Sequence, residues 1–446
     1  MLAAWARDLR YAMRSLTRQR GTAAVAVLSL GLGVGVATTA FTLLNAMALR
    51  DLPGVKAQDR LVMLGVSLEQ ATGRRLRTLL SVPEVELLAG HGELFSGMTA
   101  AGPTEVAVAV GGEPAAMPAE VTLANHFRVL GTRPELGRFF TPEDNRPGAT
   151  TAVVSHGVGQ RSLGGRPDVV GRDLRVNGRV FTVIGVAPEG FTGMTPGDVL
   201  SGPGGDPALW LPMGAASAAL PPWARAGARS PESQWLRVAA RLRDGVTAER
   251  LASALPRVSA ELERAYPDAG RGAQLVTGDL IFGPGAGRWR ATLTVLAFMV
   301  VPLLVLLIAA ANAANLLLAR TLSRRRELAV RSALGASRGA LARSVVAESV
   351  LLAGAGGVLG LAVAVWSRQL ASLFAVRLVS AAPLDLRVFG FTLAASVSVG
   401  LLFGLVPALG AGRPAAGAAL SGASRSGETR AAAGIRRGLV VAQVAL

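Results

Sequence analysis

TAAVAVLSLGLGVGVATTAFTLLNAMAL, residues 22–49, runs for a full membrane thickness without a single charged side chain. A helix needs about 20 apolar residues to cross the hydrocarbon core of a bilayer. Three further apolar runs follow at about residues 291–318, 345–366 and 388–409. We therefore predict an integral membrane protein with an α-helical bundle of four transmembrane helices, in keeping with a mean hydropathy of +0.43.

Positive charge flanks these apolar runs. Residues 1–20 and 291–446 carry +15 of the formal net charge of +17, whereas residues 21–290 hold 26 basic and 24 acidic residues. Cytoplasmic loops of membrane proteins carry an excess of arginine and lysine. The pattern therefore places the N-terminus, the 320–343 loop and the 413–437 linker in the cytoplasm, and residues 50–289 outside. A nucleic-acid-binding protein would more typically carry a basic stripe on its soluble part, so nucleic acid is not expected as a partner.

The two ends of the chain have their own character. Residues 1–21 alternate apolar side chains (Leu2, Trp5, Leu9) with arginines at helical spacing, which predicts an amphipathic helix in the cytoplasmic headgroup layer. Residues 438–446 begin a fifth apolar segment but are too few to span a bilayer. We expect a truncated chain or the first half of a duplicated permease.

The segment between the first two membrane helices predicts an extracytoplasmic α+β domain. Alternating apolar residues around Asn177-Gly178 indicate a β-hairpin over 173–184, and a second hairpin is expected around Gly111-Gly112. A strand over 236–242 and a helix capped by Thr247 should follow. The Gly/Pro-rich stretch at 192–232 is expected to be a loop or an insertion.

Several kinds of chemistry are excluded. Cysteine is absent, so the chain forms no disulfide. Lys56 is the only lysine and its context does not fit a P-loop, so the chain carries no Walker-type ATPase and is not expected to be an enzyme. The three histidines, His91, His126 and His156, lack the spacing of metal ligands and are expected to be surface or structural residues.

Two sets of motifs resemble the MacB/FtsX-like permease family of ABC transporters. In the later membrane segments they are ANAANLLLAR (311–320), RRRELAVRSALGAS (324–337) and Glu348-Ser349. In the outer segment they are NHFRVLG (125–131), LGRFFTPE (136–143), VVS (153–155) and VGRDL (170–174) through VAP (186–188). The resemblance implies a MacB-like periplasmic core domain at 50–289 and an FtsX-like permease domain at 290–412.

The resemblance also implies partners and a location. ATP would be bound by a separate cytoplasmic ABC ATPase subunit, with no cofactor on this chain. The permease would lie among lipids in a bacterial inner membrane, pair as a dimer of permease units or halves, and leave room for a periplasmic adaptor.

The 320–343 loop is where the resemblance implies that an ATPase docks. Charged residues begin its amphipathic segment, apolar residues follow, and a glycine ends it; the docking set is Arg324, Arg325, Arg326, Glu327, Leu328, Arg331, Leu334 and Gly335. The simpler interpretation is that the arginines hold the orientation of the helices and bind anionic lipid.

Three polar residues fall inside or at the start of membrane helices: Asn312, Asn315 and Glu348. A buried polar group in lipid costs free energy unless it is paired. They could form a gate or an ion path, but interhelical hydrogen bonds that fix packing are the favoured interpretation. G-x-x-x-G pairs such as Gly31/Gly35 and Gly356/Gly360 would let helices approach closely.

Two functions share these features. The favoured one is a permease that couples ATPase motion to the outer domain and exports a substrate. The alternative is an FtsX-like transmitter that controls a periplasmic enzyme and transports nothing. A membrane enzyme is the weakest hypothesis, because the apolar runs contain no catalytic cluster.

Overall fold

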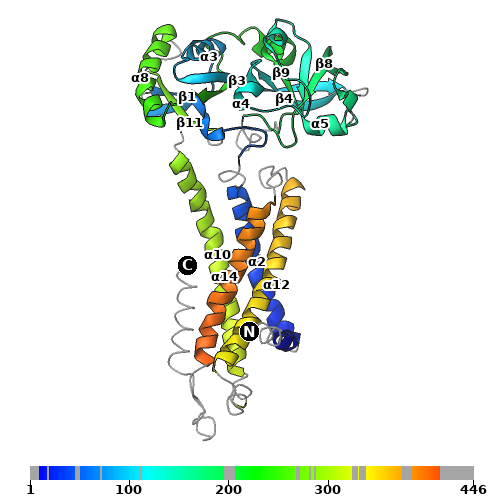
Figure 1. The fold of residues 1–446 in the computed structure, drawn as a ribbon, viewed down its shortest axis with the longest axis vertical. Coiled ribbons are helices and arrows are strands. Elements are labelled where there is room, and N and C mark those ends of the chain that lie inside the picture. The colour runs from blue at the N-terminus through cyan, green and yellow to red at the C-terminus, as the bar shows by residue number, and fades with distance from the viewer. Residues whose placement is uncertain are drawn as a thin grey trace. The chain divides into compact units, whose positions relative to one another are not determined.

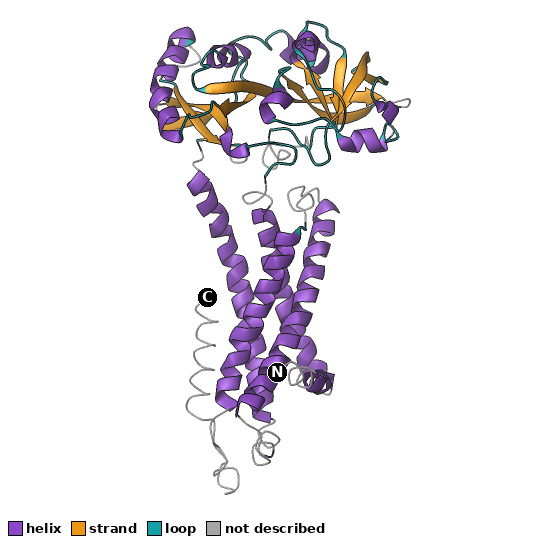
Figure 2. Ribbon diagram, in the orientation of Figure 1, coloured by secondary structure: helices purple, strands orange, loops and turns teal. Residues whose placement is uncertain are grey.

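The computed structural model describes residues 10–17, 20–45, 51–70, 73–109, 113–165, 167–194, 206–267, 272–280, 283–285, 288–323, 330, 338–373 and 384–411. The chain forms two compact units, one comprising Met1–Leu49 with Leu293–Leu446 and the other Arg50–Thr292. Figure 1 shows the elements of each, and Figure 2 shows that helices form the first unit whereas strands dominate the second. We call them the membrane unit and the outer domain.

Long helices build the membrane unit: α2 (Arg20–Leu44), α10 (Arg288–Ser323), α12 (Arg338–Leu373) and α14 (Leu386–Ala411). Among the described residues, three stretches are long and apolar enough to cross a membrane: Arg20–Leu44, Leu296–Leu317 and Arg343–Leu370. The corresponding part of α14, Leu386–Leu401, is shorter. Three membrane helices therefore agree with the sequence prediction, and the count of four crossings stays a prediction.

Facing glycines bring α2 and α12 together. A Cβ atom added at Gly31, Gly35, Gly356 or Gly360 would come within 2.5–2.8 Å of a side chain on the other helix. Only a hydrogen fits at that separation, so the two G-x-x-x-G pairs form one reciprocal interface. The predicted close approach is confirmed at these four positions.

Small residues also join the remaining helices of the bundle. A Cβ on Gly400 of α14 would lie 2.8 Å from Ala353 of α12, and one on Gly33 of α2 would lie 2.6 Å from Ala309 of α10. A buried apolar cluster runs between all four helices, with members such as Leu30, Ala310, Leu352 and Val399. Packing of this kind drives helix association where there is no hydrophobic effect.

The outer domain is organised around one mixed sheet. Its strands are β1 (Leu61–Gln70), β2 (Gly73–Arg77), β3 (Phe95–Ala109), β4 (Ala115–Thr122), β5 (Leu136–Gly137), β6 (Thr151–Val154), β7 (Asp173–Val176), β8 (Arg179–Val186), β9 (Leu209–Pro212), β10 (Arg237–Leu242), β11 (Gln274–Asp279) and β12 (Gly283–Pro284). The order is β12-β11-β1-β10-β3-β4-β9-β6-β8-β5, with β2 paired to β1 and β7 paired to β3 and β8. Its helices are α3 (Val82–Ala89), α4 (His126–Leu130), α5 (His156–Arg161), α6 (Ala216–Ala219), α7 (Pro222–Arg225) and α8 (Ala248–Ala265).

Both faces of this sheet are buried. Leu64 of β1 packs in a cluster with Leu88 of α3 and Val258 of α8. The neighbouring residue Met63 belongs to a second cluster, which contains Phe127 of α4. Successive strand residues point to opposite faces. Helices α3 and α8 therefore cover one side of the sheet, and α4 covers the other.

The strongest local predictions in this domain are confirmed. β7 and β8 pair as an antiparallel hairpin, and Asn177 and Gly178 at its turn have φ angles of 48° and 82°, as a type I′ turn requires. β3 and β4 form the second hairpin, although residues 110–112 at its tip lie outside the described residues. β10 covers the predicted strand. Thr247 caps α8 by accepting a hydrogen bond from the backbone N–H of Arg250.

The prediction that residues 192–232 are only a loop or an insertion is wrong. Leu209–Pro212 forms β9, which lies between β4 and β6 and is buried along its whole length. The short helices α6 and α7 follow it. Four apolar residues buried on both faces give no alternation that sequence inspection can detect. Residues 195–205 lie outside the described residues.

Candidate functional site

The predicted docking loop connects α10 to α12. Arg324, Arg325, Arg326, Glu327, Leu328, Arg331, Leu334 and Gly335 all lie outside the described residues. Its boundaries are described: α10 ends at Ser323 and α12 begins at Arg338. Val330 is the one described position between them, and its side chain is 59% exposed. The docking assignment therefore remains a prediction from the sequence.

Glu348 joins α12 to the helix that precedes the first membrane span. The hydroxyl of Ser15 donates to Oε1 of Glu348 over 3.2 Å, and Ser15 is buried. The described part of that amphipathic helix is 10–17, and Leu16 packs against the apolar cluster of the bundle. This contact favours a packing role for Glu348, because it fixes one end of the amphipathic segment to a membrane helix.

The two asparagines of α10 differ from one another. Asn312 lies on the exposed surface of α10, whereas Asn315 is half-buried. Oδ1 of Asn315 has no hydrogen-bond partner among the described residues. A polar oxygen at this depth is costly in lipid unless another group reaches it.

Sequence inspection missed a series of polar contacts where α2 meets α12 and α14. The hydroxyls of Thr38 and Thr392 are 3.1 Å apart, as are those of Thr39 and Ser367. Just past the C-terminal end of α2, Nδ2 of Asn45 donates to Oδ2 of Asp385 over 2.9 Å. Spacing within each helix could have placed these residues on inward faces, but not matched them across helices.

Asp385 serves two purposes at the start of α14. Its Oδ1 accepts hydrogen bonds from the backbone N–H groups of Arg387 and Val388, which caps the helix. Its Oδ2 accepts the hydrogen bond from Asn45, which is fully buried. The ends of α2 and α14 are thereby joined by one carboxylate.

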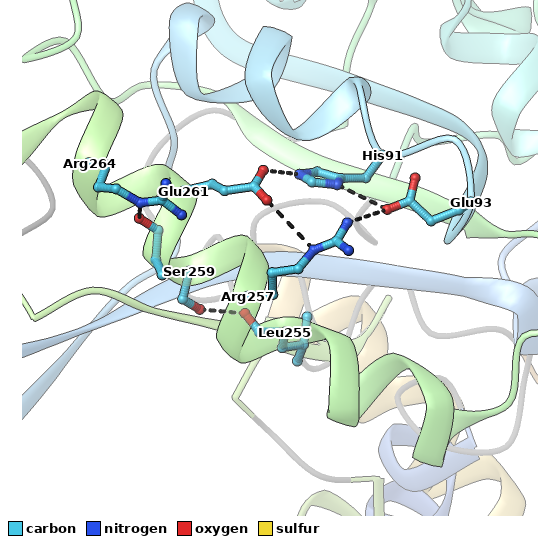
Figure 3. A network of polar contacts seen from close by, with 8 residues as sticks. His91, Glu93, Leu255, Arg257, Ser259, Glu261 and Arg264 are labelled. Atoms are coloured by element: carbon cyan, nitrogen blue, oxygen red, sulfur yellow. Dashed lines mark hydrogen bonds and ion pairs between the residues drawn. The ribbon is translucent and has the colours of Figure 1, made fainter.

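The outer domain contains the three histidines, each in a different setting. His91 lies between two carboxylates, with Nδ1 3.2 Å from Glu93 and Nε2 3.3 Å from Glu261, and Arg257 bridges the same two acids (Figure 3). This network ties the turn after α3 to α8.

His126 is fully buried, and its burial lowers its pKa to about 3. His156 contacts Glu135 over 2.6 Å. Among the described residues, no group of three or more acidic or histidine side chains could hold a metal ion. The structural role expected for the three histidines stays a prediction.

Two families match the chain in consecutive order. The MacB-like periplasmic core domain matches residues 23–258, and the FtsX-like permease C-terminal domain matches residues 299–415.

Curated relatives resemble the same regions. The pyoverdine export ATP-binding/permease protein PvdT of Pseudomonas syringae pv. tomato is 27% identical over 291 residues, which are 65% of this chain and 40% of that protein. The macrolide export ATP-binding/permease protein MacB 2 of Aeromonas hydrophila is 27% identical over 294 residues, covering 64% of this chain and 40% of that protein. The chain thus spans about two fifths of the length of these relatives.

A solved structure is also similar to part of the chain. The periplasmic region of MacB from Actinobacillus actinomycetemcomitans aligns over 52% of this chain and 93% of its own, with 13% identity and a TM-score of 0.36. The family assignment rests on the two domain matches, which together extend from the first membrane helix into the last. The chain belongs to the MacB/FtsX-like family of ABC transporter permeases.

Proposed function

We propose that this chain is the permease subunit of a MacB-like exporter in a bacterial inner membrane, driven by ATP that a separate cytoplasmic subunit hydrolyses. The observation that carries the proposal is the order of the two matched domains, with the periplasmic core placed between the first membrane helix and the later ones. Relatives with the same domains are named export ATP-binding/permease proteins. Export therefore has more support than signalling to a periplasmic enzyme.

The proposed route of coupling starts at the 320–343 loop. Its arginines would meet acidic groups on the ATPase, and Leu328 and Leu334 would pack against an apolar face of that partner. Movement would then pass along α10 and α12 to the segments that enter and leave the outer domain. Two permease units or halves would act as a pair, with a periplasmic adaptor as a further partner on the outer side.

Co-purification tests the docking proposal. An affinity-tagged chain, extracted from its native membrane, should retain an ABC ATPase. Leu328→Asp should reduce the retained ATPase at least about tenfold. A charge buried in a desolvated contact weakens binding by about 1.4 kcal/mol or more, which is a tenfold loss of affinity. Charge reversal at Arg325 and Arg326 should weaken retention and make it more salt-sensitive, since exposed charges are screened over about 8–10 Å.

A matched control comes from the outer domain. Charge reversal at Arg250 and Arg264, both exposed on α8, changes net charge equally and should leave ATPase retention unchanged. Normal retention in the Leu328→Asp and double-arginine variants, at normal expression, would exclude this loop as the docking site. Failure of the wild-type chain to retain any ATPase would contradict the proposed function itself.

A further inference from the structure

The chain enters the outer domain through a short segment with little regular structure. We call residues 51–60 the first linker, because it follows α2 and leads into β1. Leu52 is buried and its N–H donates to Oε1 of Gln58 over 2.7 Å. Ala57 has a φ of 45°, a left-handed conformation that is uncommon for a residue with a Cβ. Such a backbone persists only where its surroundings hold it.

Arg241 on β10 holds the first linker at this point. Its Nη2 donates to the carbonyl of Lys56 over 2.7 Å, and its Nη1 donates to the carbonyl of Ala57 over 3.2 Å. Its Nε donates to the carbonyl of Val129 in α4 over 2.7 Å. One guanidinium thus joins the linker, a central strand and the helix that covers that face of the sheet.

The same place is packed closely by backbone. The N–H of Lys56 donates to the carbonyl of Leu130 over 2.9 Å, next to the contact that Arg241 makes with Val129. Gly131 has a φ of 71°, and a Cβ there would lie 3.0 Å from Cβ of Lys56. The linker therefore lies against the end of α4, and there is no space for a larger residue at position 131. Arg241 closes the contact from the side of the sheet.

The charges near Arg241 explain why this position needs an arginine. Arg60 forms its own ion pair with Asp244 over 2.5 Å and donates to the carbonyl of Leu242. Burial and the nearby Arg60 lower the pKa of Arg241, so a cation is kept here at a cost. The three carbonyl contacts offset that cost, and they need the planar fork of a guanidinium, which a lysine cannot reproduce.

We propose that Arg241 is a positioning residue that fixes the first linker to β10 and α4, so that a displacement of α2 moves the sheet as one body. This rests on the proposed function only in assigning that displacement to an ATPase. The contact uses backbone carbonyls, so it does not depend on the side chains of the linker. The exit from the domain is held differently: β12 pairs with β11, and Pro284 lies against Gly65 of β1.

Hydrogen exchange of the full-length chain in detergent tests the clamp. The N–H groups of Val55, Lys56 and Arg60 are bonded within or next to the linker. In Arg241→Met these amides should exchange at least about tenfold faster, because each charge-assisted bond is worth about that factor or more. Amides of β3 and β8 should keep their protection. Arg241→Lys should give an intermediate rate at the linker.

Arg243→Met is the control, since Arg243 is exposed and lies two residues further along the same chain segment. It should leave exchange at the linker unchanged. Unaltered linker exchange in Arg241→Met would overturn the proposal. So would a uniform loss of protection across the sheet in both Arg241 variants, which would make Arg241 a residue of general stability only.

A second readout separates positioning from stability. With the ATPase retained, Arg241→Met should keep wild-type ATPase binding and hydrolysis, because the proposed docking loop is untouched. The ATP-dependent change in outer-domain exchange should be lost. If that change persisted at wild-type size in Arg241→Met, the clamp would not transmit movement. If no ATPase is retained by wild type, the proposed function fails while the exchange test of the linker still stands.

Discussion

At the scale of single residues, His126 shows how far burial alone can set a property of this domain. Burial lowers its pKa to about 3, and no charged neighbour among the described residues contributes to that shift. Thr99 lies 3.4 Å from its Nδ1, and its Nε2 has no hydrogen-bond partner among the described residues. The imidazole is therefore neutral in the fold at neutral pH.

This setting predicts an acid-sensitive outer domain. The folded-state pKa lies below the ordinary value of about 6.5, so the unfolded chain binds the proton first and stability falls as pH drops from about 6.5 towards 3. Between pH 7 and pH 5 the loss from His126 should be about 2 kcal/mol. For a domain of this size that is about 4–8 °C in Tm. Thermal unfolding of the wild-type chain and of His126→Asn at both pH values measures it.

His156→Asn serves as the comparison for this prediction. His156 is partly exposed and contacts Glu135, so its replacement should not remove the acid-dependent drop in Tm. A wild-type drop that is the same size in His126→Asn would show that other groups cause it.

The sequence alone predicts little about the surroundings of these residues. The sequence predicts structural roles for the three histidines, because no metal-ligand spacing connects them, and that role stays a prediction. It could not place His91 between Glu93 and Glu261, since residue 261 lies on a helix 170 positions away in the chain. The role of Arg241 could not be predicted either, because its partners are backbone carbonyls, which carry no sequence signal.

At the scale of elements, the reciprocal glycine interface of α2 and α12 is the best-defined part of the bundle. Gly360→Leu should destabilise it, because a Cβ there already meets Val34 at 2.8 Å and the backbone N of Gly35 at 3.0 Å. Overpacking of this kind costs about 1–3 kcal/mol. We expect a lower Tm in detergent and a smaller yield of monodisperse protein.

Gly354→Leu is a matched control on the same helix. Gly354 is exposed and a Cβ there would meet nothing within 4 Å. Its Tm should stay within the error of wild type. Equal losses in the two variants would mean that glycine content of α12, and not contact with α2, sets the stability.

Elements were predicted well where their signals are local. Long uncharged runs, the Asn-Gly turn and the Thr247 cap each depend on a few neighbouring residues, and the structure bears them out. β9 was missed because four buried residues have no period. The pairing of α2 with α12 needed tertiary information, although the G-x-x-x-G spacing had marked both surfaces.

At the scale of the whole molecule, we propose that one chain carries both a substrate-handling outer domain and an ATPase-docking loop. The charge distribution predicts the two sides of the membrane, and the family resemblance implies the two roles. The sequence does not identify the partners or the substrate, because specificity in such a domain depends on surface shape. The central claim is that the loop and the outer domain lie on opposite faces of the membrane.

Thiol labelling tests that claim most directly, because the chain has no cysteine of its own. Single variants Ser337→Cys in the loop and Ser253→Cys on the exposed side of α8 are treated in intact spheroplasts with a membrane-impermeant maleimide, and again after lysis. We predict that Ser253→Cys is labelled in intact spheroplasts and that Ser337→Cys is labelled only after lysis. Labelling of Ser337→Cys in intact spheroplasts, with Ser253→Cys protected until lysis, would contradict the arrangement and the coupling proposed from it.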